Sequence, residues 1–141
     1  MFNPNIWLKN CFSASTSQAT ITLIARAFMA YIFIVAGWGK IGGYAGTAGY
    51  MASKGIPEWM LVLVILLELG GGIAILVGFQ TRVVALFLVL FNILTALIFH
   101  GDPSDATAFM KNIAMAGGFL YLMVYGAGRI SLDYLLEGKK L

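Results

Sequence analysis

The sequence contains little charge and few residues with reactive side chains. Only 11% of its 141 residues are Asp, Glu, Lys or Arg, and 60% are hydrophobic, whereas an average soluble domain carries about 25% charged residues. This composition excludes an ordinary soluble domain and indicates a polytopic membrane protein. The net charge of +3 is spread along the chain, so it gives no basic footprint for nucleic acid and we expect no nucleic-acid partner.

The scarcity of cysteine and histidine excludes several kinds of site. Cys11 has no second cysteine with which to form an internal disulfide or a CxxC redox pair. A single histidine, His100, does not suffice for the usual zinc or haem ligand sets. Because the chain also lacks a nucleotide-binding motif, we expect no metal and no covalently bound cofactor.

Four apolar runs dominate the chain, at residues 20–38, 60–77, 83–99 and 109–125. Each is about 17 to 20 residues long, which is enough for a helix to cross a hydrocarbon core of roughly 30 Å. The sequence therefore predicts an all-α membrane protein with a four-transmembrane-helix bundle, in contact with the lipid bilayer. Its expected parts are an N-terminal tail at 1–16, a transmembrane domain at 17–128 and a C-terminal tail at 129–141.

The segment between the first two runs is too short and too polar to cross a membrane. Within residues 44–54, the side chains of Tyr44, Thr47, Ala48 and Met51 would share one face of a short helix. We expect this helix to lie in the membrane interface and to cap one end of the bundle. A disordered loop is the alternative.

Short polar residues mark where three of the spans begin. Their side chains are the usual acceptors for the free N–H groups of a first helical turn. The candidate N-caps are Ser17 for the first span, Thr81 for the third, and Ser104 or Asp105 for the fourth.

One carboxylate interrupts the second span near its middle. Glu68 would lie close to the bilayer midplane, where insertion experiments assign an acidic residue a cost of roughly 3 kcal/mol. Such a residue is normally turned away from lipid and is either partnered or protonated. We therefore expect Glu68 to face the interior of the bundle.

Small residues follow this carboxylate. Gly70, Ala74 and Gly78 recur every four residues, a spacing that lets another helix approach closely. Gly71 and Gly72 extend the series to three consecutive glycines. The glycines either allow close helix packing alone or leave room for a ligand beside the carboxylate.

Arg26 in the first span is the expected partner of Glu68. The two side chains carry opposite charges, and each would lie roughly 10 to 15 Å from the same membrane boundary at the helical rise of 1.5 Å per residue. A pair would avoid leaving two lone charges in lipid. It would either fix the helix register or hold a polar head group or a proton.

Other polar side chains lie near the outer ends of three helices, namely Lys40, His100, Lys111 and Asn112. His100 closes the third span, and these four residues could form a cationic pocket. Asn92 lies in the middle of the third span, about level with Glu68. His100 is either a satisfied helix-end residue or a group that exchanges protons.

The distribution of Lys and Arg predicts the orientation in the membrane. One side holds Lys9, Arg82, Arg129, Lys139 and Lys140, and the other holds Lys40, Lys54 and Lys111. Because positive charge is enriched on the cytoplasmic side, we expect both termini to be cytoplasmic.

A set of polar and glycine positions runs through almost the whole membrane part. It comprises Arg26, Gly37-x-x-Lys40, Gly55-Ile-Pro57, Glu68-x-x-Gly71-Gly72, Gly78-x-x-Thr81-Arg82, His100, Lys111-Asn112, Gly117-Gly118 and Gly126-x-Gly128-x-x-Ser131-Leu-Asp133. This set resembles the DoxX family of small bacterial inner-membrane proteins. The resemblance implies a four-helix membrane protein, linked in some members to quinone-dependent thiosulfate oxidation, quinone resistance and oxidative-stress defence.

Three functions are compatible with these residues. The first is a quinone-linked redox component, whose electrons come from a redox partner protein or a small reductant. The second is a small carrier or proton path, which four helices support best as a homo-oligomer. The third is a non-catalytic membrane anchor or assembly partner. For the first, Glu68 and His100 are the catalytic candidates, and the candidates for contact with a quinone are Arg26, Lys40, Glu68, Gly71, Gly72, Asn92, His100 and Asn112.

Overall fold

The computed structural model describes residues 2–137, which form helices and contain no strand. Lys139 and Lys140, which contribute to the predicted orientation, and the end of the predicted tail at 129–141 lie outside the described residues. The helical elements are α1 (Pro4–Cys11), α2 (Ser15–Gly42), α3 (Tyr44–Ser53), α4 (Met60–Ile65), η1 (Leu66–Gly70), α5 (Gly71–Val77), α6 (Thr81–Phe99), η2 (Pro103–Asp105), α7 (Ala106–Tyr125) and α8 (Leu132–Leu136).

Four helical segments are long and apolar enough to cross a membrane, which confirms the predicted bundle. They are α2, the continuous segment Met60–Val77, α6, and the segment Pro103–Tyr125. The second segment carries three labels because a π-helical turn, η1, separates α4 from α5. The short helix expected between the first two spans is α3. Of the four side chains predicted to share one of its faces, Ala48 and Met51 are buried, whereas Tyr44 is 40% exposed.

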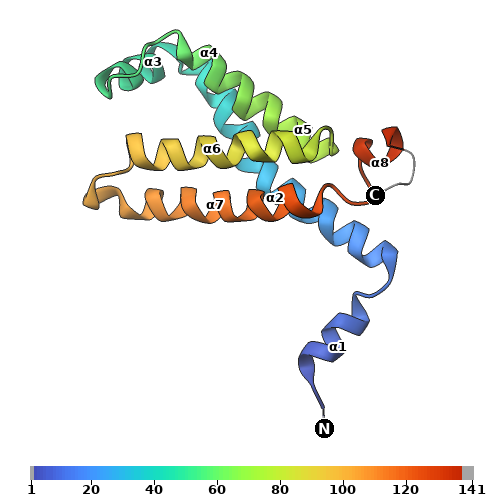
Figure 1. Ribbon diagram of the computed structural model, residues 1–141. Helices are drawn as coiled ribbons and strands as arrows, with labels where there is room; N and C mark the ends of the chain where they lie inside the picture. The colour runs from blue at the N-terminus through green and yellow to red at the C-terminus, as the bar shows by residue number, and fades with distance from the viewer. Residues whose placement is uncertain (1, 138–141) are drawn as a thin grey trace.

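The spans form two antiparallel pairs that cross each other. α6 and α7 run side by side, and α2 packs along Met60–Val77 while it crosses the α6–α7 pair at an angle (Figure 1). The core lies at this crossing, where the rings of Phe33 and Phe119 meet edge to face with centroids 5.3 Å apart. The α3 end of one pair and the α6–α7 loop of the other lie apart in the same view.

Two glycines allow α2 to approach the second span closely. A Cβ atom on Gly37 would lie 2.7 Å from the backbone nitrogen of Leu69, and one on Gly72 would lie 2.9 Å from Cγ1 of Ile34. Real Cβ atoms do not make contacts this short, so only glycine fits at either position. Backbone contact at these two points fixes which side chains of the two helices lie opposite each other.

The predicted close approach of another helix along Gly70, Ala74 and Gly78 is wrong at Gly70, and at Gly78 the close neighbours are Arg26 and the C-terminal segment. A Cβ atom on Gly70 would meet nothing within 4 Å, whereas Gly71 and Gly72 are buried. The π-helical turn ends at Gly70 and contains more residues than an α-helical turn. It therefore rotates the following residues about the axis, and the glycine that faces α2 is Gly72.

The starts of the spans differ in detail from the prediction. α2 begins at Ser15 after Ala14, so the predicted cap at Ser17 is wrong and the helix starts before the expected domain boundary. Thr20 Oγ1 donates to the carbonyl of Thr16 within that first part of the helix. Asp105 is the N-cap residue of α7, one of the two predicted alternatives, although its side chain makes no capping hydrogen bond.

α1 lies apart from the bundle. None of its residues is buried, and Trp7 and Cys11 are exposed. In Figure 1 it projects beyond the start of α2, on the side of the molecule where the N-terminus lies. α1 is therefore not packed into the bundle.

Candidate functional site

Glu68 lies on the π-helical turn and faces the interior of the bundle, as predicted. It is 6% exposed, and its Oε2 lies 2.6 Å from Nζ of Lys40 on α2. π-helical turns often occur at functional sites, because the extra residue changes the direction in which a side chain points. The turn places a carboxylate between helices at a depth where it needs a partner.

The partner of Glu68 is Lys40, so the predicted pair with Arg26 is wrong. Gly37 contacts Leu69, and this contact brings together Lys40, one turn after Gly37, and Glu68, next to Leu69. Arg26 lies 14 residues before Lys40 on the same helix, or about 21 Å along its axis. The prediction failed because it estimated depth from the ends of apolar runs, whereas the glycine contact sets the register.

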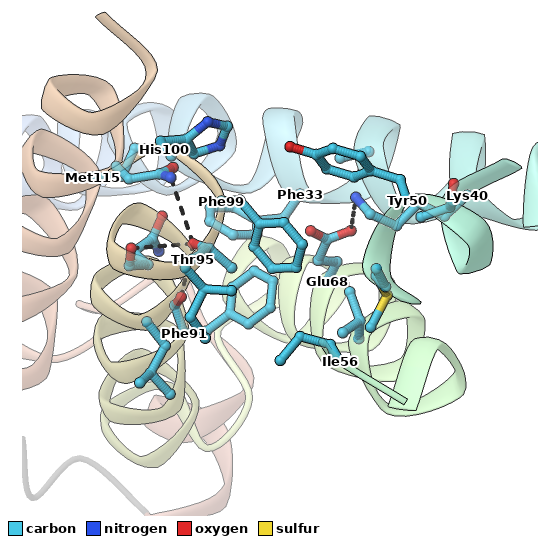
Figure 2. A pocket seen from close by; sticks show the side chains of 18 of the residues that line it. Phe33, Lys40, Tyr50, Ile56, Glu68, Phe91, Thr95, Phe99, His100 and Met115 are labelled. Atoms are coloured by element: carbon cyan, nitrogen blue, oxygen red, sulfur yellow. Dashed lines mark hydrogen bonds and ion pairs between the residues drawn. The ribbon is translucent and has the colours of Figure 1, made fainter. Parts of the chain in front are cut away.

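A cavity of about 370 Å³ lies beside this ion pair. Figure 2 shows Glu68 and Lys40 on one side of it, His100 and Thr95 on the other, and Phe91 and Phe99 between them. The walls are predominantly apolar, and α2, α3, the second span, α6 and α7 all contribute to them. The polar lining residues are Lys40, Thr47, Tyr50, Glu68, Asn92, Thr95, His100, Lys111 and Asn112.

Most of the polar residues predicted for a site do meet in this cavity, namely Lys40, Glu68, Asn92, His100 and Asn112. The structure does not bring Arg26, Gly71 or Gly72 to it. Gly71 packs against Val84 and Leu88, and Gly72 packs against α2. These two glycines therefore serve helix packing, and the room for a ligand lies on another face of the span.

The amides on the far side of the cavity retain hydrogen-bonding capacity. Asn92 Nδ2 donates to the carbonyl of Leu88 at 2.7 Å. Asn112 Nδ2 makes a long contact of 3.5 Å with Thr95 Oγ1, which itself donates to the carbonyl of Phe91. Each amide has two N–H donors and a carbonyl acceptor, so both can make a further bond to a bound molecule.

Thr95 and Tyr50 line the cavity and Asp105 lies next to it, and none of the three was among the predicted candidates. Thr95 follows Asn92 by three residues on α6 and shares its face, a spacing that could have identified it. Tyr50 comes from α3, and its ring lies 5.6 Å from that of Phe99. Asp105 lies behind His100, because its Oδ2 contacts Nδ1 of that histidine, and its predicted role was only that of a helix cap.

Arg26 belongs to a second polar cluster, near the turn between α5 and α6. It is 1% exposed, and its guanidinium donates to the backbone carbonyls of Ile75 and Ile130. Both acceptors are main-chain atoms at a helix end or in a loop, where carbonyls lack helical partners. Arg26 thus ties α2 to the α5 end and to the segment before α8, which is a structural role.

Asp133 caps α6 from the C-terminal segment. Its carboxylate accepts the backbone N–H groups of Gln80 at 2.7 Å and Thr81 at 2.9 Å, and its own N–H donates to the carbonyl of Gly78. The prediction of Thr81 as the N-cap residue of this span is therefore wrong. Thr81 is the first residue of α6, and the N-cap residue is Gln80. A carboxylate at a helix N-terminus is also favoured by the helix dipole.

Metal-ion chemistry finds no support in the arrangement of side chains. Among residues 2–137, no group of three or more His, Cys, Asp or Glu side chains comes together. The polar groups of the cavity are instead the Lys40–Glu68 ammonium–carboxylate pair, a second ammonium on Lys111, two amides, hydroxyls and one imidazole. These groups can hold a small polar or mixed polar and apolar molecule and can exchange protons with it.

Comparison with known proteins gives consistent relatives. The chain is 53% identical over 120 residues to "Inner membrane protein YqjF" of Escherichia coli (strain K12), covering 83% of this chain and 92% of the relative. It is 37% identical over 132 residues to "Inner membrane protein YphA" of the same organism, covering 86% and 94%. It is 35% identical over 128 residues to "Putative oxidoreductase CatD" of Bacillus subtilis (strain 168), covering 84% and 90%.

No solved structure gives a significant match to the chain. The family model described as DoxX matches residues 21–101, which include most of α2 and the whole of α3, the second span and α6. The matched part holds both members of the Lys40–Glu68 pair and the cavity residues as far as His100. Together with the relatives, this match shows that the chain belongs to the DoxX family.

Proposed function

We propose that the chain is a quinone-linked redox component of a bacterial inner membrane, with both termini in the cytoplasm. The observation that carries the proposal is the Lys40–Glu68 ion pair on the wall of a cavity that is otherwise mostly apolar. A quinone has a flat apolar ring and carbonyl oxygens, so its surface suits an apolar cavity with a few polar groups. The printed name of the Bacillus subtilis relative supports a redox role.

The cavity itself favours ligand binding over a purely structural role. Leu88 and Phe119 in the adjoining core are 0% exposed, so the sequence is able to fill space between these helices. An empty cavity lowers stability by roughly 24 cal/mol per Å³ of residual volume. A bound ring would recover the lost contacts, which an anchor protein would have no need to leave open.

The side chains present can hold such a ring and supply protons. Lys40 has three N–H donors and uses one of them on Glu68, so it can also donate to a carbonyl oxygen. His100 lies across the cavity from Lys40 (Figure 2), and Asn112 also lines it, so both are available to an oxygen at the other end of the ring.

Reduction of a quinone to a quinol takes up two electrons and two protons. Since the chain has one cysteine, one histidine and no nucleotide-binding motif, the electrons would come from a partner protein or a small reductant such as a reduced sulfur compound. The contribution of this chain is to bind the ring, exclude water from it and exchange protons with its oxygens.

The binding of tetramethyl-1,4-benzoquinone tests the proposal. Its ring positions are all substituted, and a Cys11→Ser background removes the only thiol that could form an adduct. Saturating quinone should raise the melting temperature of the purified protein, because a ligand that binds only the folded state stabilises it. Tetramethylbenzene, which lacks the carbonyls, should produce a much smaller shift.

Variants then localise the binding. Lys40→Met should abolish the quinone-induced shift, whereas Lys54→Met, which changes a lysine outside the cavity, should retain it. If the quinone-induced shift in melting temperature persists in Lys40→Met, the quinone binds elsewhere. If neither the wild-type protein nor any variant shows a saturable shift, the proposed function is wrong and the anchor function replaces it.

A further inference from the structure

His100 lies between the cavity and the water on the α3 side of the molecule. It ends α6 and lines the cavity, while its Nδ1 contacts Oδ2 of Asp105 at the end of η2. The side chains of His100 and Asp105 are 26% and 47% exposed. One face of the imidazole therefore belongs to the cavity and the other to an accessible carboxylate.

The opposite direction, toward the termini, is closed by packing. Ile75, Leu88 and Phe119, from three different spans, are 0% exposed and belong to one core cluster. Beyond them, the Arg26 guanidinium is held by backbone carbonyls of Ile75 and Ile130. Among residues 2–137, no line of polar side chains leads from the cavity to the side where α1 and α8 lie.

We infer that the cavity exchanges water and protons with the α3 side of the membrane alone, and that His100 carries the protons. The access follows from the packing, and only the identity of the molecule that takes the proton rests on the proposed function. The charged groups that face His100 are Asp105 on η2, Lys111 on α7 and the Lys40–Glu68 pair across the cavity.

The proton step is an acid–base exchange that needs no oxidant or reductant. Nδ1 of His100 is engaged by Asp105, which leaves Nε2 to act as donor or acceptor. The Nε2–H bond of the imidazolium breaks as its proton moves to an oxygen in the cavity. The neutral imidazole then takes a proton at Nε2 from water that enters the cavity, and Asp105 keeps the ring in one orientation throughout.

Cysteine labelling tests the access, because the native chain has a single thiol at Cys11. In the Cys11→Ser background, Thr95→Cys places a thiol in the cavity, and Ser104→Cys places one on the exposed α6–α7 connection. Wild-type Cys11 marks the other side. A small membrane-impermeant thiol reagent is added to spheroplasts and, separately, to inside-out vesicles.

The Thr95→Cys protein should react from the same side as the Ser104→Cys protein and not from the side that labels Cys11. This expectation does not depend on which side is cytoplasmic. Reaction from the Cys11 side, from both sides, or from neither while Ser104→Cys reacts would each overturn the inference.

The role of His100 is tested by the pH dependence of tetramethyl-1,4-benzoquinone binding. A charged donor makes a stronger hydrogen bond than a neutral one, so affinity should rise several-fold when the pH is lowered enough to protonate the imidazole. The quinone affinity of His100→Gln should not change with pH, whereas that of Lys54→Gln should change as in the wild-type protein. An affinity that still depends on pH in His100→Gln would overturn the role of His100. Absence of binding at every pH would contradict the proposed function and leave the labelling result intact.

Discussion

Lys40 on α2 and Glu68 on the π-helical turn form an ion pair of 2.6 Å, and both side chains line the same cavity. The pair is held by the backbone rather than by side chains alone, because Gly37 meets Leu69 directly beside it. The geometry of the site is therefore set by the packing of two helices, and a substitution at Gly37 should also change the distance between Lys40 and Glu68.

Removal of one member of the pair should destabilise the protein. A charge left alone in a buried position costs roughly 3 to 5 kcal/mol, and we expect the lower part of this range because the Lys40 side chain is 24% exposed. Lys40→Met and Glu68→Gln should each lower the free energy of unfolding in detergent, and the double variant should be less destabilised than the sum. A matched cycle with Arg26→Met and Glu68→Gln should be additive, since those residues have separate partners. Additive losses for Lys40 and Glu68 would show that the pair is not coupled.

Gly37→Ala should lower stability although it adds a single methyl group. Its Cβ would lie 2.7 Å from the Leu69 nitrogen, and forced overpacking of this kind costs typically 1 to 3 kcal/mol, here about 2. Gly39→Ala is the matched control, because its Cβ would meet nothing within 4 Å and alanine favours the helix. The melting temperature of Gly37→Ala should fall clearly below that of the wild-type protein, whereas that of Gly39→Ala should stay the same or rise. Equal melting temperatures would show that α2 and the second span are not in backbone contact.

Asp133→Ala should weaken the junction between α6 and the C-terminal segment. It removes the acceptor of two backbone N–H groups, and each unsatisfied buried donor costs about 1 to 3 kcal/mol. We expect a total loss of roughly 2 kcal/mol or more in chemical denaturation, while Glu137→Ala at an exposed position of the same segment should change stability by less than about 0.5 kcal/mol. Increased hydrogen exchange at Gln80 and Thr81 would locate the effect, and unchanged exchange would contradict the cap.

The carboxyl of Asp102 offers a test outside the membrane. Hydrogen bonds from the hydroxyl and the backbone N–H of Ser104, together with the nearby charge of Lys54, lower its pKa below the ordinary value. A depressed folded pKa contributes stability above the unfolded pKa and loses it as the pH falls through the folded pKa. Ser104→Ala should therefore raise the pKa of Asp102 in a carbon-detected NMR titration. A pKa that stays in place would mean that the hydroxyl does not bond the carboxylate in solution.

The number of spans, the short helix between the first two and the inward position of Glu68 could be predicted because each depends on local composition. A run of about 20 apolar residues must cross the membrane, and a carboxylate within it must avoid lipid. These rules hold whatever the other helices do. His100 and Asn112, which the sequence places near the outer helix ends, also meet in one cavity.

The partner of Glu68 could not be predicted in the same way. Whether it meets Lys40 or Arg26 depends on how far one helix slides along another, which Gly37 and Gly72 decide through contacts between residues distant in sequence. The capping of α6 by Asp133 has the same origin, because the chain returns to that helix only after α7. The π-helical turn further shifts the faces of the second span by an amount that the α-helical period does not show.

The central claim is that a quinone occupies the cavity beside Lys40 and Glu68. Its most direct test is extraction of the protein from its native membrane without detergent, followed by mass spectrometry of the lipids that co-purify. The wild-type protein should carry close to one quinone per chain, and the Lys40→Met, Glu68→Gln double variant, which leaves no lone charge, should carry far less. An equal quinone content in the two proteins, or none in either, would contradict the account.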